Sequence, residues 1–130
     1  MIKKAILCID DDKTILDSLK SQLQRNFNDG FVFEFAEDAE EGFEVINDLN
    51  KDNTKILVLI SDWLMPGMKG DEFLIKVHKK YPGIVKVMLT GQADGLAIKR
   101  AHDEANLFRH IAKPWNETEL IQTIRSGLNL

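Results

Sequence analysis

The sequence predicts an α/β protein with a doubly wound architecture, in which helices cover both faces of a parallel β-sheet. Five apolar runs alternate strictly with five segments whose apolar residues recur at helical spacing, the pattern of parallel strands joined by right-handed crossovers. The third run contains five consecutive branched apolar residues, 56–60, as expected for a strand buried on both faces. The chain of 130 residues is long enough for a substantial core, and we expect residues 1–130 to form a single domain.

The first half of the chain supplies two strands and two helices. Residues 3–9 form an apolar run that stops at three aspartates, and Asp12 is placed to cap a helix over residues 13–27. Residues 31–36 alternate apolar and polar side chains, which predicts the second strand. Residues 38–49 carry apolar side chains at helical spacing and predict the second helix.

The second half is organised around a strand that ends on a carboxylate. The apolar run over residues 55–62 stops at Asp62, and Pro66 and Gly67 interrupt the chain before a helix predicted over residues 69–81. A carboxylate at the carboxyl end of a parallel strand lies where open α/β sheets bind ligands. Asp62 is therefore the first candidate for a functional residue.

Three further elements and a final helix complete the alternation. Residues 84–90 predict the fourth strand, residues 93–105 the fourth helix and residues 107–112 the fifth strand. Asn116, followed by Glu119 three positions later, resembles a capping box that opens the last helix. The fourth helix is expected to turn four residues toward the core: Leu96, Ala97, Ala101 and Ala105.

Composition and charge exclude several classes of function. Hydrophobic residues make up 44% of the chain and charged residues 29%, as in ordinary globular proteins. The net charge of −4 argues against direct binding to nucleic acid, because such binding depends on neutralising phosphates. Cys8, the single cysteine, excludes an internal disulfide and is expected to be a buried core thiol. No stretch is long enough to span a membrane, so we expect a cytoplasmic protein.

Polar residues follow four of the five predicted strands. They are Asp10 and Asp11 after the first strand, Asp62 after the third, Thr90 after the fourth and Lys113 after the fifth. The carboxyl ends of parallel strands share one edge of the sheet, so these side chains can converge, and three carboxylates held together favour a divalent cation. Oxygen ligands favour Mg²⁺, and a metal with a lysine and a hydroxyl suits phosphoryl transfer, with Asp62 as the nucleophile.

These segments, in this order and across the whole chain, resemble the receiver domains of two-component response regulators. The matching segments are Asp10-Asp11, the run Asp-Trp-Leu-Met-Pro-Gly-Met-Lys-Gly over residues 62–70, Met-Leu-Thr-Gly over residues 88–91, and Lys113-Pro114. The resemblance implies a flavodoxin-like (βα)5 sandwich with the strand order 2-1-3-4-5.

The resemblance also implies roles for individual residues. Asp62 would accept a phosphoryl group from a histidine kinase or a phosphotransfer protein, and the chain would act as a signalling module rather than an enzyme. Mg²⁺, or Mn²⁺ in its place, would assist the reaction. The residues implied as metal ligands or phosphoryl contacts are the carboxylates of Asp10, Asp11 and Asp62, the carbonyl of Leu64, the side chains of Thr90 and Lys113, and the backbone N–H groups of Trp63 and Gly91.

Two positions depart from the pattern of the family. Gly91 stands where receivers usually have alanine, which keeps the approach of the backbone open. His110 stands where receivers usually have the aromatic switch residue that moves with Thr90. Such movement would reshape the face of the fourth helix, fifth strand and fifth helix, where partners or a second copy of the chain would bind. An imidazole changes charge near neutral pH, so we expect activation to be pH-sensitive.

Two other functions compete with this interpretation. A phosphatase that works through an aspartyl phosphate would place a second aspartate two residues after the nucleophile, where this chain has Leu64. A flavodoxin-like FMN-binding protein would need a glycine- and hydroxyl-rich loop after the first strand, where this chain has three aspartates. Leu64 and Gln92 occupy positions that influence attack by water in receivers, and the apolar Leu64 predicts a long-lived phosphoryl group.

Overall fold

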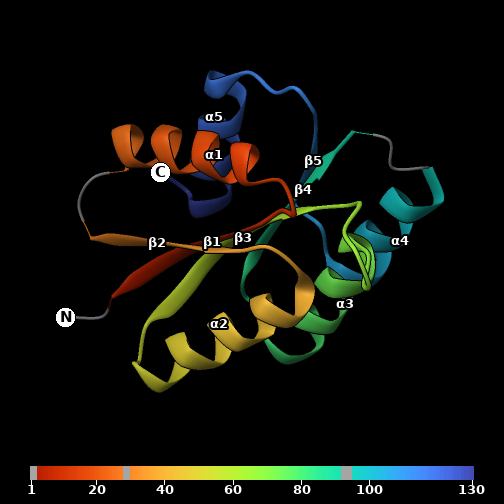
Figure 1. Ribbon diagram of the computed structural model, residues 1–130, viewed down its shortest axis with the longest axis horizontal. Helices are drawn as coiled ribbons and strands as arrows, with labels where there is room; N and C mark the ends of the chain where they lie inside the picture. Colours follow the sequence, from red (N-terminus) through yellow and green to blue (C-terminus); the bar gives the residue numbers. More distant parts are fainter. Residues whose placement is uncertain (1–2, 28–29, 92–94) are drawn as a thin grey trace.

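The computed structural model describes residues 3–27, 30–91 and 95–130, which fold into one five-stranded parallel sheet with helices on both faces (Figure 1). The strands lie in the order β2-β1-β3-β4-β5. The predicted fold class and strand order are therefore confirmed. The elements are β1 Lys4–Ile9, α1 Lys13–Asn26, β2 Phe31–Ala36, α2 Ala39–Lys51, β3 Lys55–Asp62, α3 Gly70–Lys80, β4 Val85–Thr90, α4 Gly95–Ala105, β5 Arg109–Ala112 and α5 Glu117–Leu128.

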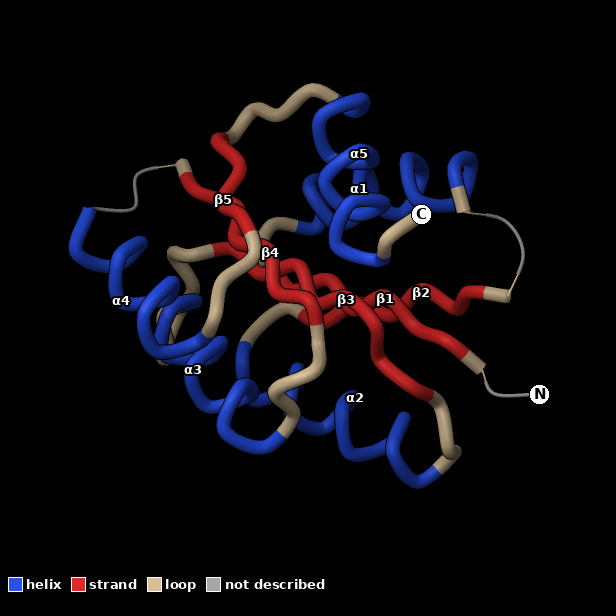
Figure 2. The backbone as a smooth tube through the Cα atoms, turned by 180° about the vertical axis from the view of Figure 1, so that it is seen from behind, coloured by secondary structure: helices blue, strands red, loops and turns tan. Residues whose placement is uncertain are grey.

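The sheet separates two apolar layers, as the backbone view from behind shows (Figure 2). Helices α1 and α5 pack on one face, while α2, α3 and α4 cover the other. In the central strand β3, Val58 and Ile60 face the first layer and Leu59 faces the second, all without solvent exposure. Burial on both faces explains the unbroken apolar run of this strand. Cys8 in β1 is also fully buried, and burial raises the pKa of its thiol, which keeps it unreactive.

Polar side chains fix where three helices begin. The carboxylate of Asp12 accepts the N–H of Thr14, and the carboxylate of Asp38 accepts the N–H of Glu41. The amide oxygen of Asn116 accepts the N–H of Thr118 at the start of α5. Each bond satisfies a backbone donor that has no partner within its helix. The caps predicted at Asp12 and Asn116 are thus confirmed, whereas Asp38 precedes α2 instead of belonging to it.

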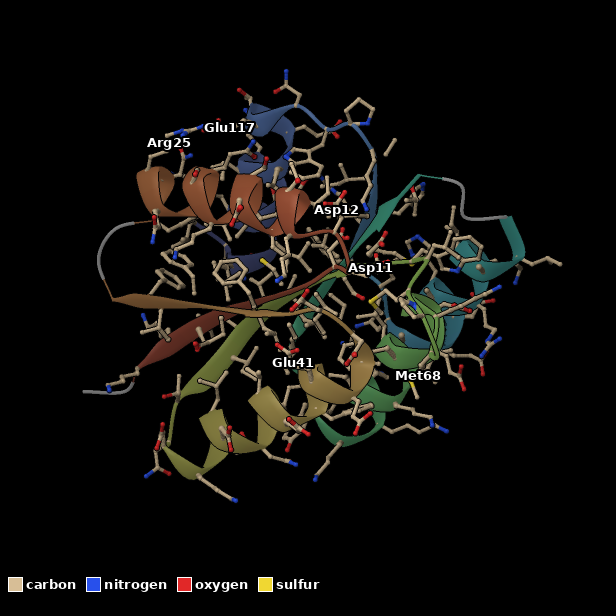
Figure 3. All side chains as sticks on the ribbon, viewed as in Figure 1. Asp11, Asp12, Arg25, Glu41, Met68 and Glu117 are labelled. Carbon is tan, nitrogen blue, oxygen red and sulfur yellow. The ribbon has the colours of Figure 1, made fainter. Side chains whose placement is uncertain are left out.

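Helices α1 and α5 are tied together away from the sheet. Arg25 of α1 donates to both carboxylate oxygens of Glu117 in α5, and the two side chains face each other in Figure 3. The indole N–H of Trp115 donates to Oε1 of Gln22 at 2.8 Å. These contacts fix the segment between β5 and α5, which begins with Lys113. The position of Lys113 therefore depends on contacts between α1, near the start of the chain, and the segment that leads into α5.

Helix α4 departs from the sequence-based expectation. Ala97, Ala101 and Ala105 are buried as predicted, but Leu96 is 79% exposed, so its assignment to the core was wrong. The partly buried Ile98, rather than Leu96, packs against the core beside the three alanines. Strand β5 is also shorter than predicted, because Leu107 and Phe108 precede it. Two predictions, the role of Gln92 and the start of the fourth helix at Ala93, concern positions outside the described residues.

One charged side chain is buried inside the sheet layer. Lys86 of β4 is 1% exposed, and its ammonium donates to the carbonyl of Ile84 at 2.8 Å. Burial lowers the pKa of Lys86, since the ammonium loses hydration. Desolvation of the His78 ring on α3, together with the charge of Lys86, lowers the pKa of His78. None of the helices in the described residues is long and apolar enough to cross a membrane.

Candidate functional site

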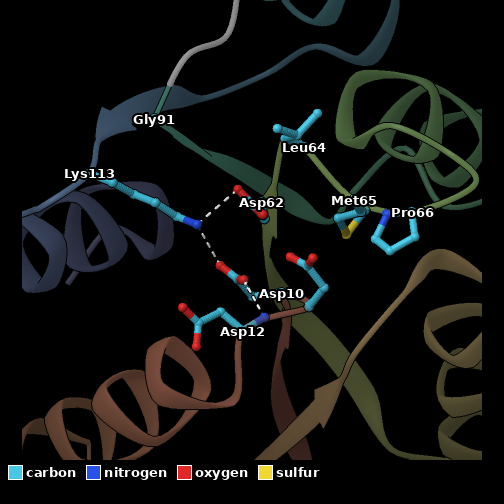
Figure 4. Close-up of a pocket in the computed structure, with 9 residues that line it drawn as sticks. Asp10, Asp12, Asp62, Leu64, Met65, Pro66, Gly91 and Lys113 are labelled. Atoms are coloured by element: carbon cyan, nitrogen blue, oxygen red, sulfur yellow. Dashed lines mark hydrogen bonds and ion pairs between the residues drawn. The ribbon is translucent and has the colours of Figure 1, made fainter.

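A pocket of about 690 Å³ opens at the carboxyl edge of the sheet, where β1, β3, β4 and β5 end (Figure 4). Segments that are a hundred residues apart in the sequence meet there, as expected for parallel strands. The residues that line the pocket are Asp10, Asp11, Asp12, Asp62, Leu64, Met65, Pro66, Gly91 and Lys113.

Lys113 joins the two buried carboxylates of the pocket. Its Nζ lies 2.8 Å from Oδ2 of Asp10 and 2.9 Å from Oδ1 of Asp62. Both carboxylates are almost fully buried, whereas Asp11 is exposed. The second oxygen of Asp10 accepts the N–H of Asp12 at 2.9 Å. The ammonium therefore neutralises part of the charge that the strand ends bring together.

The electrostatics of the pocket follow from burial and from these contacts. Burial raises the pKa of Asp62; the hydrogen bond from Lys113 lowers it, and the charges of Asp10 and Asp11 raise it, so the net shift is upward. Burial lowers the pKa of Lys113, but its bonds to Asp10 and Asp62 outweigh burial and raise it overall. Lys113 therefore stays an ammonium while Asp62 carries a charge that the fold stabilises poorly.

The donor set of the pocket fits a hard divalent cation. Asp10, Asp11 and Asp62 each offer one carboxylate oxygen, and these three oxygens lie within 4.8 Å of one another. In the part of the chain that the structure describes, this is the one such group of acidic, histidine or cysteine side chains. Oxygen ligands at this spacing suit Mg²⁺ or Mn²⁺, and the excess negative charge gives such an ion a reason to bind. The carbonyl of Leu64 remains a predicted ligand.

The loop after β3 is held tightly against the strand that carries Asp62. The N–H of Trp63 donates to the carbonyl of Leu89 at 3.0 Å, and the N–H of Gly70 donates to the carbonyl of Trp63 at 2.7 Å. A Cβ atom on Gly70 would lie 2.1 Å from the carbonyl oxygen of Asp62. Only glycine fits at this approach, so the loop fixes the backbone on either side of the acceptor carboxylate.

The other predicted site residues lie around the pocket without all lining it. Thr90 is buried, and its hydroxyl donates to the carbonyl of Ile111 at 3.4 Å, while Gly91 lines the pocket. Trp63 turns its indole ring away from the pocket toward α3. His110 is exposed on β5, and its ring meets the ring of His102 of α4 edge to face, with centroids 5.9 Å apart. The roles assigned to these residues remain predictions.

Sequence reasoning missed several residues that the fold brings to this region. Asp12 lines the pocket in addition to capping α1, and Met65 and Pro66 form its wall. Asp71, at the start of α3, is buried beside Trp63. An aspartate in the first turn of a helix is expected for its favourable interaction with the helix dipole. This position does not predict that the side chain is buried.

An open parallel sheet that gathers three carboxylates and an ammonium at its carboxyl edge defines a class of flavodoxin-like proteins with a carboxylate-rich ligand site. The family sequence model for the response regulator receiver domain matches residues 6–125 of this chain. The chain belongs to this family, and the resemblance noted in the sequence is thereby confirmed.

Individual relatives agree with the family assignment. The chain is 31% identical over 125 residues to a chemotaxis protein CheY homolog of Campylobacter jejuni, covering 95% of this chain and 91% of that protein. It is 28% identical to the hydrogenase transcriptional regulatory protein HoxA of Cupriavidus necator, covering 95% of this chain and 24% of HoxA. The chain thus spans about a quarter of the length of the HoxA proteins that it matches.

Crystal structures of receivers share the fold closely. The signal receiver domain of an HD domain-containing protein from Pseudomonas fluorescens superposes with a TM-score of 0.86 at 28% identity, covering 98% of this chain and 95% of that one. A CheY-like receiver domain protein from Methanospirillum hungatei gives a TM-score of 0.83 at 34% identity, covering 99% and 95%.

Proposed function

We propose that this chain is a phosphoacceptor, in which Asp62 receives a phosphoryl group from the phosphohistidine of a histidine kinase or of a phosphotransfer protein. The observation that carries the proposal is the contact of Lys113 with both Asp10 and Asp62 beside the exposed Asp11. An acceptor carboxylate, two further carboxylates for a metal and a mobile ammonium meet in one open pocket. This is the equipment that phosphoryl transfer requires of a protein.

The proposed reaction makes one bond and breaks one bond. A carboxylate oxygen of Asp62 attacks phosphorus while the P–N bond of the phosphohistidine breaks, and the bonding electrons leave with the imidazole nitrogen. The Lys113 ammonium already lies at hydrogen-bond distance from Oδ1 of Asp62, so a short movement brings it to a phosphoryl oxygen. The hydroxyl of Thr90 and the N–H group of Gly91 contact the other oxygens, whereas the N–H of Trp63, which the sequence assigned to this role, donates to the carbonyl of Leu89.

The residues for the metal are the three carboxylates and the carbonyl of Leu64. When bound there, Mg²⁺ or Mn²⁺ supplies positive charge that offsets the repulsion between the carboxylates and the incoming phosphoryl group. The carboxylates bring more negative charge than Lys113 alone can neutralise. The reaction therefore depends on the metal for charge balance.

The outcome of the reaction is a signal rather than a product. Phosphorylation moves Thr90 toward the phosphoryl group and changes the face formed by α4, β5 and α5, where the exposed His110 of β5 meets His102 of α4. A partner protein or a second copy of the chain binds this face in one of the two states. The chain is a signalling module with no substrate beyond its own phosphoryl group.

Mass spectrometry after incubation with acetyl phosphate and Mg²⁺ tests the proposal. We expect the intact protein to gain one phosphoryl group, and Asp62→Asn, of the same size, to gain none. Asp103→Asn, on the exposed face of α4, serves as the matched control and should react like the wild type. A phosphoryl group on Asp62→Asn, or none on the wild type in the presence of Mg²⁺, would overturn the proposal.

A further inference from the structure

A chain of polar contacts leads from the acceptor loop to helix α4 on the side away from the pocket. The indole N–H of Trp63 donates to Oδ1 of Asp71 at 3.1 Å. The other carboxylate oxygen, Oδ2, lies 3.6 Å from a guanidinium nitrogen of Arg100 in α4. Asp71 thus contacts the residue that follows the phosphoacceptor with one oxygen and the α4 helix with the other.

The burial of Asp71 makes both contacts consequential. Its side chain is 7% exposed, whereas Arg100 is 51% exposed. A buried carboxylate is tolerated only when it is paired and hydrogen-bonded, so loss of either partner leaves a charge in a poorly hydrated place. Asp71 therefore holds Trp63 and Arg100 in fixed positions relative to each other.

A small pocket beside Asp71 lies between the acceptor loop and α4. A pocket of about 220 Å³ separates the loop from α4 and is lined by Trp63, Lys69, Asp71, Leu96, Ala97 and Arg100. The ammonium of Lys69 lies 5.0 Å from the centre of the Trp63 ring and holds its outer face. The ion pair of Asp71 with Arg100 is a polar contact beside this pocket, in addition to the apolar cluster that Trp63 shares with Ala97.

We propose that Asp71 is a positioning residue that joins the phosphoacceptor loop to α4 through Trp63 and Arg100. The backbone of Trp63 adjoins Asp62, so a shift of this loop on phosphorylation displaces the indole, and Asp71 passes the displacement to α4. The transmission to α4 rests on the proposed phosphorylation of Asp62, whereas the link between Trp63, Asp71 and Arg100 exists before it.

Hydrogen exchange of the α4 amides in the unphosphorylated, metal-free protein tests the link itself. Asp71→Asn keeps an acceptor for the indole but removes the charge, and Arg100→Gln removes the partner charge. We expect each variant to raise exchange of residues 96–105 by about threefold to tenfold, and the double variant to raise it no further than Arg100→Gln alone, because the contact of Asp71 with Arg100 is already lost there. Arg100→Gln also breaks the exposed ion pair of Arg100 with Glu104, and Glu104→Gln measures that effect separately. Asp103→Asn, which breaks an exposed ion pair with Lys99 on the same helix, is the matched control.

Phosphorylation then tests the transmission. We expect acetyl phosphate and Mg²⁺ to change α4 exchange in the wild type and in Asp103→Asn, and to change it less than half as much in Asp71→Asn, although mass spectrometry shows equal phosphorylation. Arg100→Gln, half-exposed and tolerant of substitution, gives the same test if Asp71→Asn does not fold.

Two results would overturn the proposal: wild-type α4 exchange in both single variants, or fully additive effects in the double variant. A wild type that gains no phosphoryl group would instead contradict the proposed function and leave the result on the unphosphorylated link standing. An unchanged response of α4 to phosphorylation in the variants would refute the transmission alone.

Discussion

The ammonium nitrogen of Lys113 lies 2.9 Å from Oδ1 of Asp62, which links the loop after the edge strand β5 to the end of the central strand β3. This contact does not fully compensate the burial of the Asp62 carboxylate. Burial and the neighbouring Asp10 and Asp11 raise the pKa of Asp62 despite the lysine. The site therefore costs stability in the absence of a cation, which is common where a fold gathers charges for function.

Asp62→Asn should stabilise the metal-free protein. Because the folded pKa of Asp62 is above its unfolded value, the native state binds more protons between the two pKa values, and stability falls as pH rises through that window. The neutral amide escapes this loss. We expect a gain of about 1 kcal/mol at neutral pH that disappears toward about pH 4, measured by urea unfolding in EDTA. Lower stability of Asp62→Asn than of the wild type at neutral pH would contradict the argument.

Mg²⁺ should stabilise the wild type and alter the fluorescence of Trp63. The chain has two tryptophans, so Trp115→Phe leaves the residue beside Asp62 as the reporter. At a hundredfold excess over its dissociation constant the ion should add about 2.7 kcal/mol to stability. Asp11→Asn removes one of the three carboxylates and should weaken both effects. An emission that does not respond to Mg²⁺, or that responds equally in Asp11→Asn, speaks against the metal site.

Gly70→Ala should disrupt the loop that holds the acceptor carboxylate. The added methyl group would lie 2.1 Å from the carbonyl oxygen of Asp62 and 2.8 Å from Cα of Trp63, both rigid backbone atoms. Overpacking of this kind costs about 1–3 kcal/mol and here also displaces the site. Gly83→Ala, where nothing lies within 4 Å, is the control. Gly70→Ala should unfold at a lower temperature and be phosphorylated more slowly than Gly83→Ala. Equal values for the two variants would show that the loop backbone can shift to accommodate the added methyl group.

The site residues that could be predicted from the sequence are those whose positions are determined by the ends of the strands. Asp10, Asp62 and Lys113 follow apolar runs, and parallel strands place their carboxyl ends on one edge. Their convergence follows from topology before any side chain is placed. The direct contacts of Lys113 with Asp10 and Asp62 were not predicted, because the sequence assigned this lysine to a phosphoryl oxygen.

The residues that were misassigned depend on packing that no periodicity encodes. Leu96 occupies a helical position next to the inward alanines, yet the core contact of α4 is made by these alanines and Ile98, and the leucine faces solvent. Lys86 and Asp71 were given no place in the core or the site from the sequence, and both are buried although they are charged. Their burial is set by partners from distant elements, the carbonyl of Ile84 for Lys86 and the indole of Trp63 for Asp71.

Leu64→Asn should shorten the lifetime of the phosphoryl group. Leu64 is 55% exposed and lines the pocket two residues after Asp62, so an amide there can orient water toward the phosphorus. We expect dephosphorylation to become about tenfold faster, which corresponds to about 1.4 kcal/mol of activation free energy. Loss of phosphoryl group from purified phosphoprotein measures the rate, and Leu64→Met is the apolar control. An unchanged lifetime of the phosphoryl group in Leu64→Asn would show that residue 64 does not control its hydrolysis.

His110 should make the response to phosphorylation depend on pH. Its exposed ring contacts the ring of His102, so α4 and β5 meet through two imidazoles. Imidazoles gain charge as pH falls through the range near neutrality, and two cationic rings in contact repel each other. Acidification therefore favours separation of α4 from β5 and should change how much phosphorylation alters that face.

The comparison that decides this uses His110→Tyr, which keeps an aromatic ring without a titration near neutral pH. Hydrogen exchange of α4 and β5 is measured with and without phosphorylation at about pH 6 and at about pH 8. The wild type should differ between the two pH values and His110→Tyr should not, while His102→Gln should lose most of the difference because the repelling partner is gone. Identical pH profiles for the wild type and His110→Tyr would show that the switch position is indifferent to its charge.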